Sequence, residues 1–240
     1  MKEFLKAAAV ERAAVLDEAE LALINKQTLR PLKADEVFVF RMAACGNQVD
    51  RDHEKFSDEA LEQMSELYVG KPVLLDHKWS AGSQTARVYA AAVESQGDYK
   101  RLVLSCYCHR TAGTAETIAA IESGVLRECS VGLRVGKSVC SVCGVDQMES
   151  MCKHWPGRTY DGQVCYFTLG DVTDIYEVSL VAVPAQPDAG VTKSKRYGGM
   201  ELPENGEPPE GGDTSRANSL RLRLRVAEAK AKAAGSGQTI

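Results

Sequence analysis

Short β-rich runs, each closed by charged, glycine or proline residues, recur along most of this chain. Runs of this kind are typical of strands. Two of the runs flank Gln96-Gly97-Asp98, which favours a hairpin turn, so we expect a mostly antiparallel β-sheet. The predicted strands cover residues 37–42, 71–77, 86–93, 101–108, 129–135 and 174–183.

Three further segments have helical patterns. Residues 1–30 alternate apolar and charged side chains with no Gly or Pro before Pro31, which predicts an amphipathic helix that packs on the domain or on a partner. Ser57 is a suitable N-cap for a helix that ends at Gly70, and residues 113–123 predict a third helix that ends at Gly124. Helices beside an antiparallel sheet indicate the α+β class.

The 240 residues divide into three parts. Residues 1–34 form the helical arm, residues 35–193 a globular domain, and residues 194–240 a flexible tail rich in Gly, Pro and Glu. The net charge of −4 disfavours a protein whose main partner is a long nucleic acid. No apolar run is long enough to span a membrane and no signal peptide is evident, so we expect a soluble, intracellular protein.

Eight cysteines in a chain without an export signal favour metal binding or simple burial over disulfides. Cys140-x2-Cys143 is followed by Cys152-Lys153-His154, which gives four ligands suited to zinc within fifteen positions. Gly144 relieves the turn behind the first pair. Because four protein ligands leave no open coordination position, the sequence predicts a structural zinc site in an insertion over about 138–165.

Two alternatives remain for these cysteines. Cys165 could replace His154 or Cys152 among the ligands, and the CxxC pair could be a redox pair, although no thioredoxin-like βαβ pattern surrounds it. The other four cysteines lack metal-ligand spacing and are expected to be small core residues. They are Cys45, Cys106, Cys108 and Cys129.

The chain has only four histidines. His154 belongs to the metal candidate, while His53 lies in a charged loop and His109 directly follows a predicted strand. His77 ends an apolar strand, where a rigid element can orient it as a general base. Taken alone, a histidine at the end of a strand is more often structural than catalytic, and the same holds for a serine such as Ser130.

Three segments, in this order, resemble the caudovirus (HK97-type) prohead serine proteases. Residues 70–77, Gly-Lys-Pro-Val-Leu-Leu-Asp-His, are similar to the family's histidine motif. Residues 121–124 and 129–133 are similar to its helix and nucleophile segment, and residues 176–189, which contain Glu-Val-Ser and Pro-Ala-Gln-Pro, are similar to its closing strand. Together they cover about residues 36–192.

The resemblance implies a herpesvirus assemblin-like fold, a mostly antiparallel β-barrel with packed helices. It also implies an endopeptidase that cleaves scaffold, or the scaffold-like part of the major capsid protein, inside the assembling prohead in the bacterial cytoplasm. Such proteases commonly cleave themselves. The implied partners are therefore coat and scaffold proteins, with a homo-oligomer as a further option and no membrane.

Carried over by position, the resemblance implies that Ser130 is the nucleophile and His77 the general base. In the family, the third member of the catalytic triad lies on a strand after the serine. This position corresponds to Glu177 here, with Glu94 as the alternative. Gly132 would allow close approach of a substrate backbone. The cysteine-rich insertion between Ser130 and Glu177 departs from the family's simplest pattern and makes that spacing a poor guide.

Two other function classes compete with a protease. An inactive capsid-assembly or scaffolding component with the same fold would work through its tail, in which residues 201–213 carry five acids and residues 220–232 carry five bases. A zinc-knuckle nucleic-acid binder is disfavoured by the acidic balance and by the aromatic content of 6%.

Overall fold

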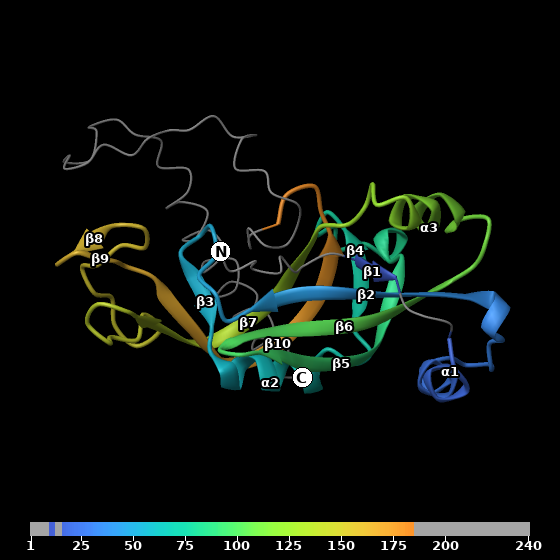
Figure 1. Ribbon diagram of the computed structural model, residues 1–240, viewed down its shortest axis with the longest axis horizontal. Helices are drawn as coiled ribbons and strands as arrows, with labels where there is room; N and C mark the ends of the chain where they lie inside the picture. The colour runs from blue at the N-terminus through green and yellow to red at the C-terminus, as the bar shows by residue number, and fades with distance from the viewer. Residues whose placement is uncertain (1–9, 13–15, 185–240) are drawn as a thin grey trace, which may run out of the picture. The chain divides into compact units, whose positions relative to one another are not determined.

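The computed structural model describes residues 10–12 and 16–184, which are mostly strand with three helices (Figure 1). The α+β class is therefore confirmed. The helices are α1 (Glu18–Asn25), α2 (Asp58–Leu67) and α3 (Ala115–Glu122), with short 3-10 helices η1 (Ala34–Glu36) and η2 (Ala81–Ser83). The strands are β1 (Val10–Arg12), β2 (Val37–Gly46), β3 (Glu54–Phe56), β4 (Pro72–Leu75), β5 (Ala86–Gln96), β6 (Tyr99–His109), β7 (Cys129–Cys140), β8 (Thr159–Tyr160), β9 (Gln163–Val164) and β10 (Phe167–Leu180).

One mixed sheet holds eight of these strands, in the order β1-β2-β6-β5-β4-β10-β3, and β7 pairs with the other side of β10. The predicted hairpin is confirmed as β5 and β6, whereas β3 and β4 both run parallel to β10. The expected closed barrel is wrong, because the described strands form an open sheet. Where β7 comes close to β2, the Sγ atom of Cys129 contacts the carbonyl of Ala43 at 3.5 Å, and no backbone ladder joins the two strands.

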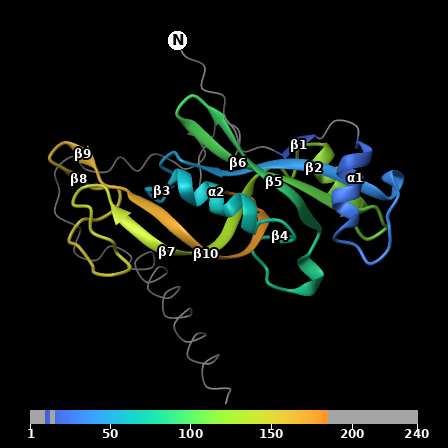
Figure 2. The same cartoon turned by 90° about the horizontal axis from the view of Figure 1, so that it is seen from below.

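Helix α2 covers the sheet beside β10 (Figure 2). Its first turn is capped by Ser57, whose hydroxyl accepts the N–H of Ala60 at 3.1 Å, and Gly70 follows its end with φ +88°. Leu61 and Met64 are fully buried against the sheet, and burial of each such side chain stabilises the fold by about 1.5–3 kcal/mol. The helix therefore anchors the part of β10 that carries the candidate site.

The N-terminal segment departs from the single predicted helix over residues 1–30. Residues 10–12 pair with β2 as strand β1, and helix α1 begins only at Glu18, after an N-cap at Asp17. Ile24 of α1 is fully buried against the sheet, which agrees with a helix that packs on the domain. Pairing with the edge of β2 satisfies the backbone groups of residues 10–12, and this long-range contact overrides their helical pattern.

The last predicted strand is longer than the sequence suggested, because β10 begins at Phe167 and not at Asp174. It pairs with β7 from Phe167↔Cys140 to Leu180↔Cys129. The residues between these two strands form the cysteine-rich insertion, which lies at one end of the sheet (Figure 1). The predicted tail, residues 194–240, lies outside the described residues.

None of the helices in the described part of the chain has the length and apolar character needed to cross a bilayer.

Candidate active site and metal cluster

His77 lies in the loop directly after β4, where backbone hydrogen bonds hold the chain. The N–H of Asp76 donates to the carbonyl of Leu180 at 3.0 Å, and the N–H of Lys78 donates to the carbonyl of Leu75 at 3.0 Å. Asp76 and His77 have φ values of 52° and 53°, and this left-handed conformation costs a non-glycine residue about 1–2 kcal/mol. Residues held in this way cluster at functional sites.

His77 is hydrogen-bonded to a buried carboxylate. Its Nδ1 atom lies 2.8 Å from Oε1 of Glu177, whose side chain is 2% exposed, whereas the His77 side chain is 41% exposed. A carboxylate accepts hydrogen bonds, so Nδ1 carries the proton and Nε2 is the acceptor of the neutral ring. An accessible imidazole oriented by a buried carboxylate is the arrangement of a general base.

Further contacts hold Glu177 in this position. Its Oε2 atom accepts a hydrogen bond from the hydroxyl of Ser179, and its backbone carbonyl accepts one from the Tyr68 hydroxyl at 3.2 Å. Tyr68 and Ser179 are both fully buried. Burial raises the pKa of Tyr68 well above its ordinary value, so this hydroxyl keeps its proton and remains a donor.

Ser130 lies opposite Ser179 in the β7–β10 ladder, and Gly132 lies opposite Glu177. Directly opposed residues of an antiparallel pair direct their side chains to the same face of the sheet, and so do residues two apart on one strand. Ser130 therefore shares a face with Glu177 and Ser179, and partial burial leaves its side chain accessible. Among the described residues no hydrogen bond joins Ser130 to His77, and in free enzymes such bonds often close only with substrate.

A β-bulge gives Glu177 its direction. The pairs Ile175↔Leu133 and Glu177↔Gly132 are consecutive in the ladder, so Tyr176 is an extra residue on β10. In a regular strand of the same sequence, residues two apart share a face, which would place Glu177 on the same face as the buried Ile175. Bulges often re-aim a side chain next to an active site, and here the bulge turns the buried carboxylate to the face opposite that of Ile175.

Gly132 lies directly beside the carboxylate of Glu177. A Cβ atom at this position would overlap Oε1 of Glu177 and come within 2.9 Å of its Cδ atom. The glycine therefore makes room for the carboxylate, and close approach of a substrate backbone to Gly132 stays a prediction.

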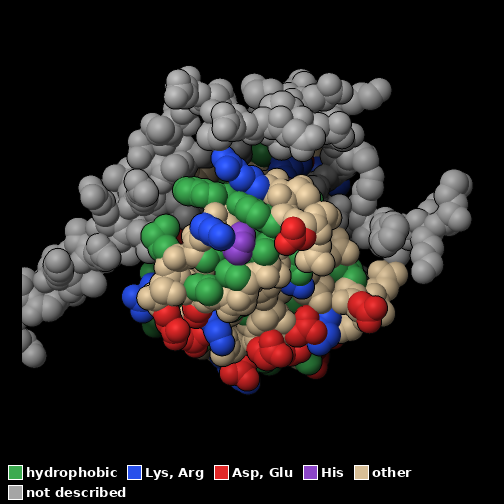
Figure 3. Space-filling model, turned by 90° about the vertical axis from the view of Figure 1, so that its left-hand side faces the viewer, with side chains coloured by type: hydrophobic (Ala, Val, Ile, Leu, Met, Phe, Trp, Pro, Cys, Tyr) green, Lys and Arg blue, Asp and Glu red, His purple; other side chains and the backbone are tan. Residues whose placement is uncertain are grey.

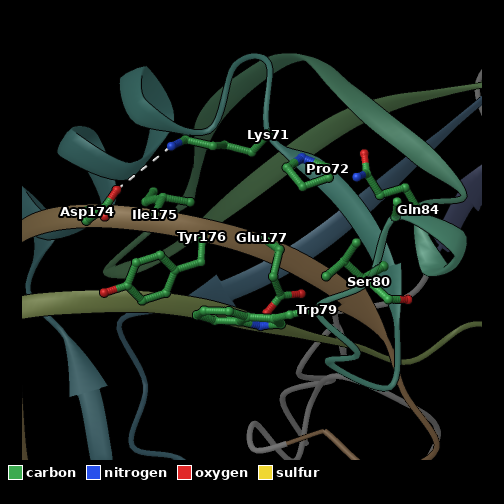
Figure 4. Close-up of a pocket in the computed structure, with 11 residues that line it drawn as sticks. Lys71, Pro72, Trp79, Ser80, Gln84, Asp174, Ile175, Tyr176 and Glu177 are labelled. Carbon is green, nitrogen blue, oxygen red and sulfur yellow. Dashed lines mark ion pairs between the residues drawn. The ribbon is translucent and has the colours of Figure 1, made fainter. Parts of the chain in front are cut away.

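A groove of about 500 Å³ lies beside this group of residues, between β10, β4 and the loop that follows β4 (Figure 4). Trp79 and Tyr176 form one side of it, with ring centroids 5.1 Å apart, and the side chain of Glu177 points toward Trp79. At the far side, Lys71 and Asp174 approach each other at 3.9 Å. Because Glu177 itself lines the groove, the groove adjoins the His77–Glu177 pair.

Glu94, the alternative third member, lies elsewhere. Its carboxylate is paired with Arg101 at 2.7 Å and with Arg41 at 2.7 Å, and these hydrogen bonds, first that of Arg101, hold the pKa of Glu94 below its usual range. Glu177 is therefore the carboxylate that the structure places against His77.

The four predicted metal ligands come together at the other end of the β7–β10 pair. The ligand atoms of Cys140, Cys143, Cys152 and His154 all lie within 4.8 Å of one another, and this cluster could hold a metal such as zinc. Gly144 has φ +72°, as the turn behind the first pair requires. Burial raises the pKa of the Cys140 thiol, but hydrogen bonds from the backbone N–H groups of Cys143 and Val142 and from the side chains of Cys143 and Cys152 together hold that pKa below its ordinary value.

Cys165 is a fifth thiol beside the cluster. Its Sγ atom lies 3.9 Å from that of Cys140, but the mutually close set of ligand atoms does not include it. Burial and then the hydrogen bond with Cys140 raise the pKa of Cys165 to about 11. The geometry thus favours His154 and Cys152 over Cys165 as ligands.

The surface around the cluster is partly apolar. Figure 3 shows hydrophobic side chains on this end of the molecule, where Met148, Met151, Trp155 and Val164 are 48–79% exposed.

The remaining four cysteines are buried, as predicted. Cys45, Cys106, Cys108 and Cys129 are at most 4% exposed. Burial raises the pKa of Cys129 to about 12 and that of Cys106 well above its ordinary value. Both thiols therefore stay protonated and unreactive near neutral pH.

Sequence reasoning missed Tyr68 and Ser179. Ser179 had a detectable signal, because a position two residues after Glu177 on a strand shares its face. Tyr68 had none, since it reaches Glu177 from α2 across 109 positions of the sequence.

Comparisons of the chain with family models, with curated proteins and with solved structures find no match.

Proposed function

We propose that this protein is a serine endopeptidase of prohead maturation, with Ser130 as nucleophile, His77 as general base and Glu177 as the orienting carboxylate. The observation that carries the proposal is the 2.8 Å bond between His77 and the buried Glu177, formed on the same face as Ser130. The order of the three motifs supports the same conclusion, as does the resemblance of residues 36–192 to prohead proteases. We assign the open sheet to the assemblin-like fold on this resemblance.

The chemistry follows from these positions. Nε2 of His77 takes the proton of Ser130 as Oγ attacks the scissile carbonyl, and the imidazolium that forms is stabilised by Glu177. His77 then gives the proton to the leaving amine, which breaks the peptide bond and leaves an acyl group on Ser130. Water, activated by His77 in the same way, releases that acyl group and restores the serine.

By resemblance, the substrates are scaffold or the scaffold-like part of the major capsid protein, together with the enzyme itself, in the prohead inside the bacterial host. The alternative is an inactive capsid-assembly component with the same fold. The left-handed backbone at His77 and the buried Glu177 favour the protease, because an inactive scaffold needs neither.

We also propose that Cys140, Cys143, Cys152 and His154 hold a structural zinc ion. Two thiolates from a CxxC turn and a thiolate and an imidazole from the following loop complete a tetrahedral shell. The insertion has few buried apolar residues of its own, so metal binding would supply its folding energy.

A fluorophosphonate probe tests the nucleophile without knowledge of the substrate, because the Oγ atom of an activated serine displaces its fluoride and forms a stable phosphonate ester. Intact mass should show one adduct on the full-length chain, located at Ser130, and none on Ser130→Ala or His77→Ala. Ser138→Ala is the matched control, since Ser138 is a buried serine at the other end of the same ladder, and it should react like the unmodified protein.

Coexpression with a candidate coat or scaffold protein then tests the substrate class. Loss of its cleavage in Ser130→Ala is expected. Labelling of Ser130→Ala at the original rate would refute the nucleophile assignment, whereas no labelling and no cleavage by the unmodified protein would favour the inactive component.

A further inference from the structure

Ser179 lies between the two members of the His77–Glu177 pair. Its hydroxyl contacts Oε2 of Glu177. The hydroxyl oxygen of Ser179 also accepts a hydrogen bond from the backbone N–H of His77 at 3.1 Å. The hydroxyl of Ser179 thus bonds both to the histidine's backbone and to the carboxylate. The residue is fully buried, so it is not accessible to a substrate and cannot replace Ser130 as nucleophile.

The direction of each hydrogen bond follows from the groups involved. A backbone N–H only donates and a carboxylate only accepts, so the hydroxyl of Ser179 accepts from His77 and gives its one hydrogen to Glu177. Hydrogen bonds arranged in such a chain polarise and strengthen one another. Both carboxylate oxygens are then occupied, Oε1 by the imidazole and Oε2 by the hydroxyl.

We infer that Ser179 is a positioning residue that fixes both the carboxylate of Glu177 and the backbone of His77. This inference deepens the proposed protease function and rests on it for its catalytic consequence. The carboxylate could otherwise rotate about its last torsion, which is broad for glutamate. With Oε2 held, Oε1 stays in line with Nδ1.

The backbone contact has a second effect. Asp76 and His77 are two consecutive non-glycine residues in the left-handed region, and such a conformation persists only where surrounding contacts determine it. The hydroxyl of Ser179 supplies the contact for His77. The side chain of Ser179 on β10 thereby fixes the position of the loop that carries His77 relative to the strand that carries Glu177.

The test compares Ser179→Ala with Ser138→Ala, which removes a hydroxyl from another buried position of the same ladder. Proton NMR of the resting full-length protein reports the hydrogen on Nδ1 of His77, which resonates far downfield when shared with a carboxylate and which His77→Ala identifies. In Ser179→Ala this resonance should move upfield or disappear through exchange, and in Ser138→Ala it should remain.

Activity gives the second measurement. Loss of one hydrogen bond to a charged group should lower the rate of fluorophosphonate labelling, and kcat for a cleaved substrate, about 10- to 100-fold with KM little changed. If Ser179→Ala fails to fold, Ser179→Cys keeps the size of the side chain but is only a weak donor, and the same shift of the resonance is expected.

An unchanged resonance in the folded Ser179 variant would overturn the inference. The NMR result does not require turnover, so it judges the positioning role even if the protein proves to have no protease activity. A shifted resonance without labelling of Ser130 would refute the proposed function and leave the role of Ser179 in holding the pair intact.

Discussion

Substitution of Gly132 by alanine should separate the His77–Glu177 pair. An added Cβ atom overlaps Oε1 of Glu177 and lies 2.9 Å from its Cδ atom. Gly132 is not among the glycines with positive φ, so alanine can adopt the backbone and the effect comes only from the collision with Glu177. The carboxyl group must therefore move.

The size of the effect follows from the geometry. To reach an ordinary van der Waals distance of 3.4 Å, Cδ must retreat by at least 0.5 Å and Oε1 by more, which stretches the 2.8 Å bond to His77 beyond hydrogen-bond range. A misplacement of about 1 Å lowers catalysis about 100-fold. The crowding should also destabilise the fold by about 1–3 kcal/mol.

A double-mutant cycle on the free energy of unfolding isolates the cause. In a Glu177→Ala background the collision is absent, so Gly132→Ala should become neutral or stabilise by about 0.4–1 kcal/mol through the unfolded state. The coupling energy between positions 132 and 177 should then be about 1–3 kcal/mol. Urea unfolding of the four proteins measures it, and a coupling energy near zero would show that the glycine is not there to admit the carboxylate.

Two other predictions concern the metal cluster and Glu94. Cys143→Ser should reduce bound zinc below one ion per chain, measured by elemental analysis, while Cys108→Ser keeps it. With free zinc about 1,000-fold above Kd, the metal stabilises the folded state by about 4 kcal/mol. Removal of the metal by a chelator should therefore lower Tm by about 10 °C. Glu94→Gln should leave labelling of the nucleophile unchanged and reduce stability at neutral pH by at most about 1 kcal/mol, because its partners are partly exposed. Since Arg101 and Arg41 lower the pKa of Glu94, its stabilisation is present above its ordinary pKa of about 4 and is lost as the pH falls through the lower folded value. The stability difference between Glu94→Gln and the unmodified protein should thus shrink in acid, and a difference that is constant from pH 7 to pH 2 would contradict the ion-pair explanation.

Local patterns in the sequence predicted the elements that depend on local interactions. The Gln96-Gly97-Asp98 turn predicted the β5–β6 hairpin, and Ser57 and Gly70 predicted the limits of α2. The metal cluster was predictable for the same reason, since its ligands lie within fifteen positions of one another and one turn brings Cys140 and Cys143 together.

Features that depend on long-range pairing were not predictable. Residues 10–12 form a strand by pairing with the edge of β2, and β7 meets β2 at the sulfur of Cys129 without the backbone ladder that would close the sheet. The insertion made the spacing between Ser130 and Glu177 uninformative. In the structure it extends the far end of the β7–β10 pair, so a longer or shorter insertion would leave Ser130 and Glu177 on the same face.

The bulge at Tyr176 gives the last prediction. Ile175 and Glu177 already lie opposite the neighbouring residues Leu133 and Gly132, so deletion of Tyr176 should convert the bulge into a regular ladder without shifting either pair. Ile175 would stay in the core and Glu177 on the site face, because adjacent strand residues point to opposite faces.

The deletion variant should therefore keep the downfield Nδ1 proton of His77 while losing one of the two aromatic rings, that of Tyr176, from the side of the groove. Its reaction with the small fluorophosphonate should continue, and cleavage of a protein substrate should weaken through KM. Deletion of Val178, one residue beyond the pair, shifts Ser179 to the opposite face by the same alternation and should abolish the resonance. If both deletions abolish the Nδ1 resonance equally, the bulge is required for the His77–Glu177 geometry itself. The prediction that Tyr176 serves the groove and not the catalytic pair would then be wrong.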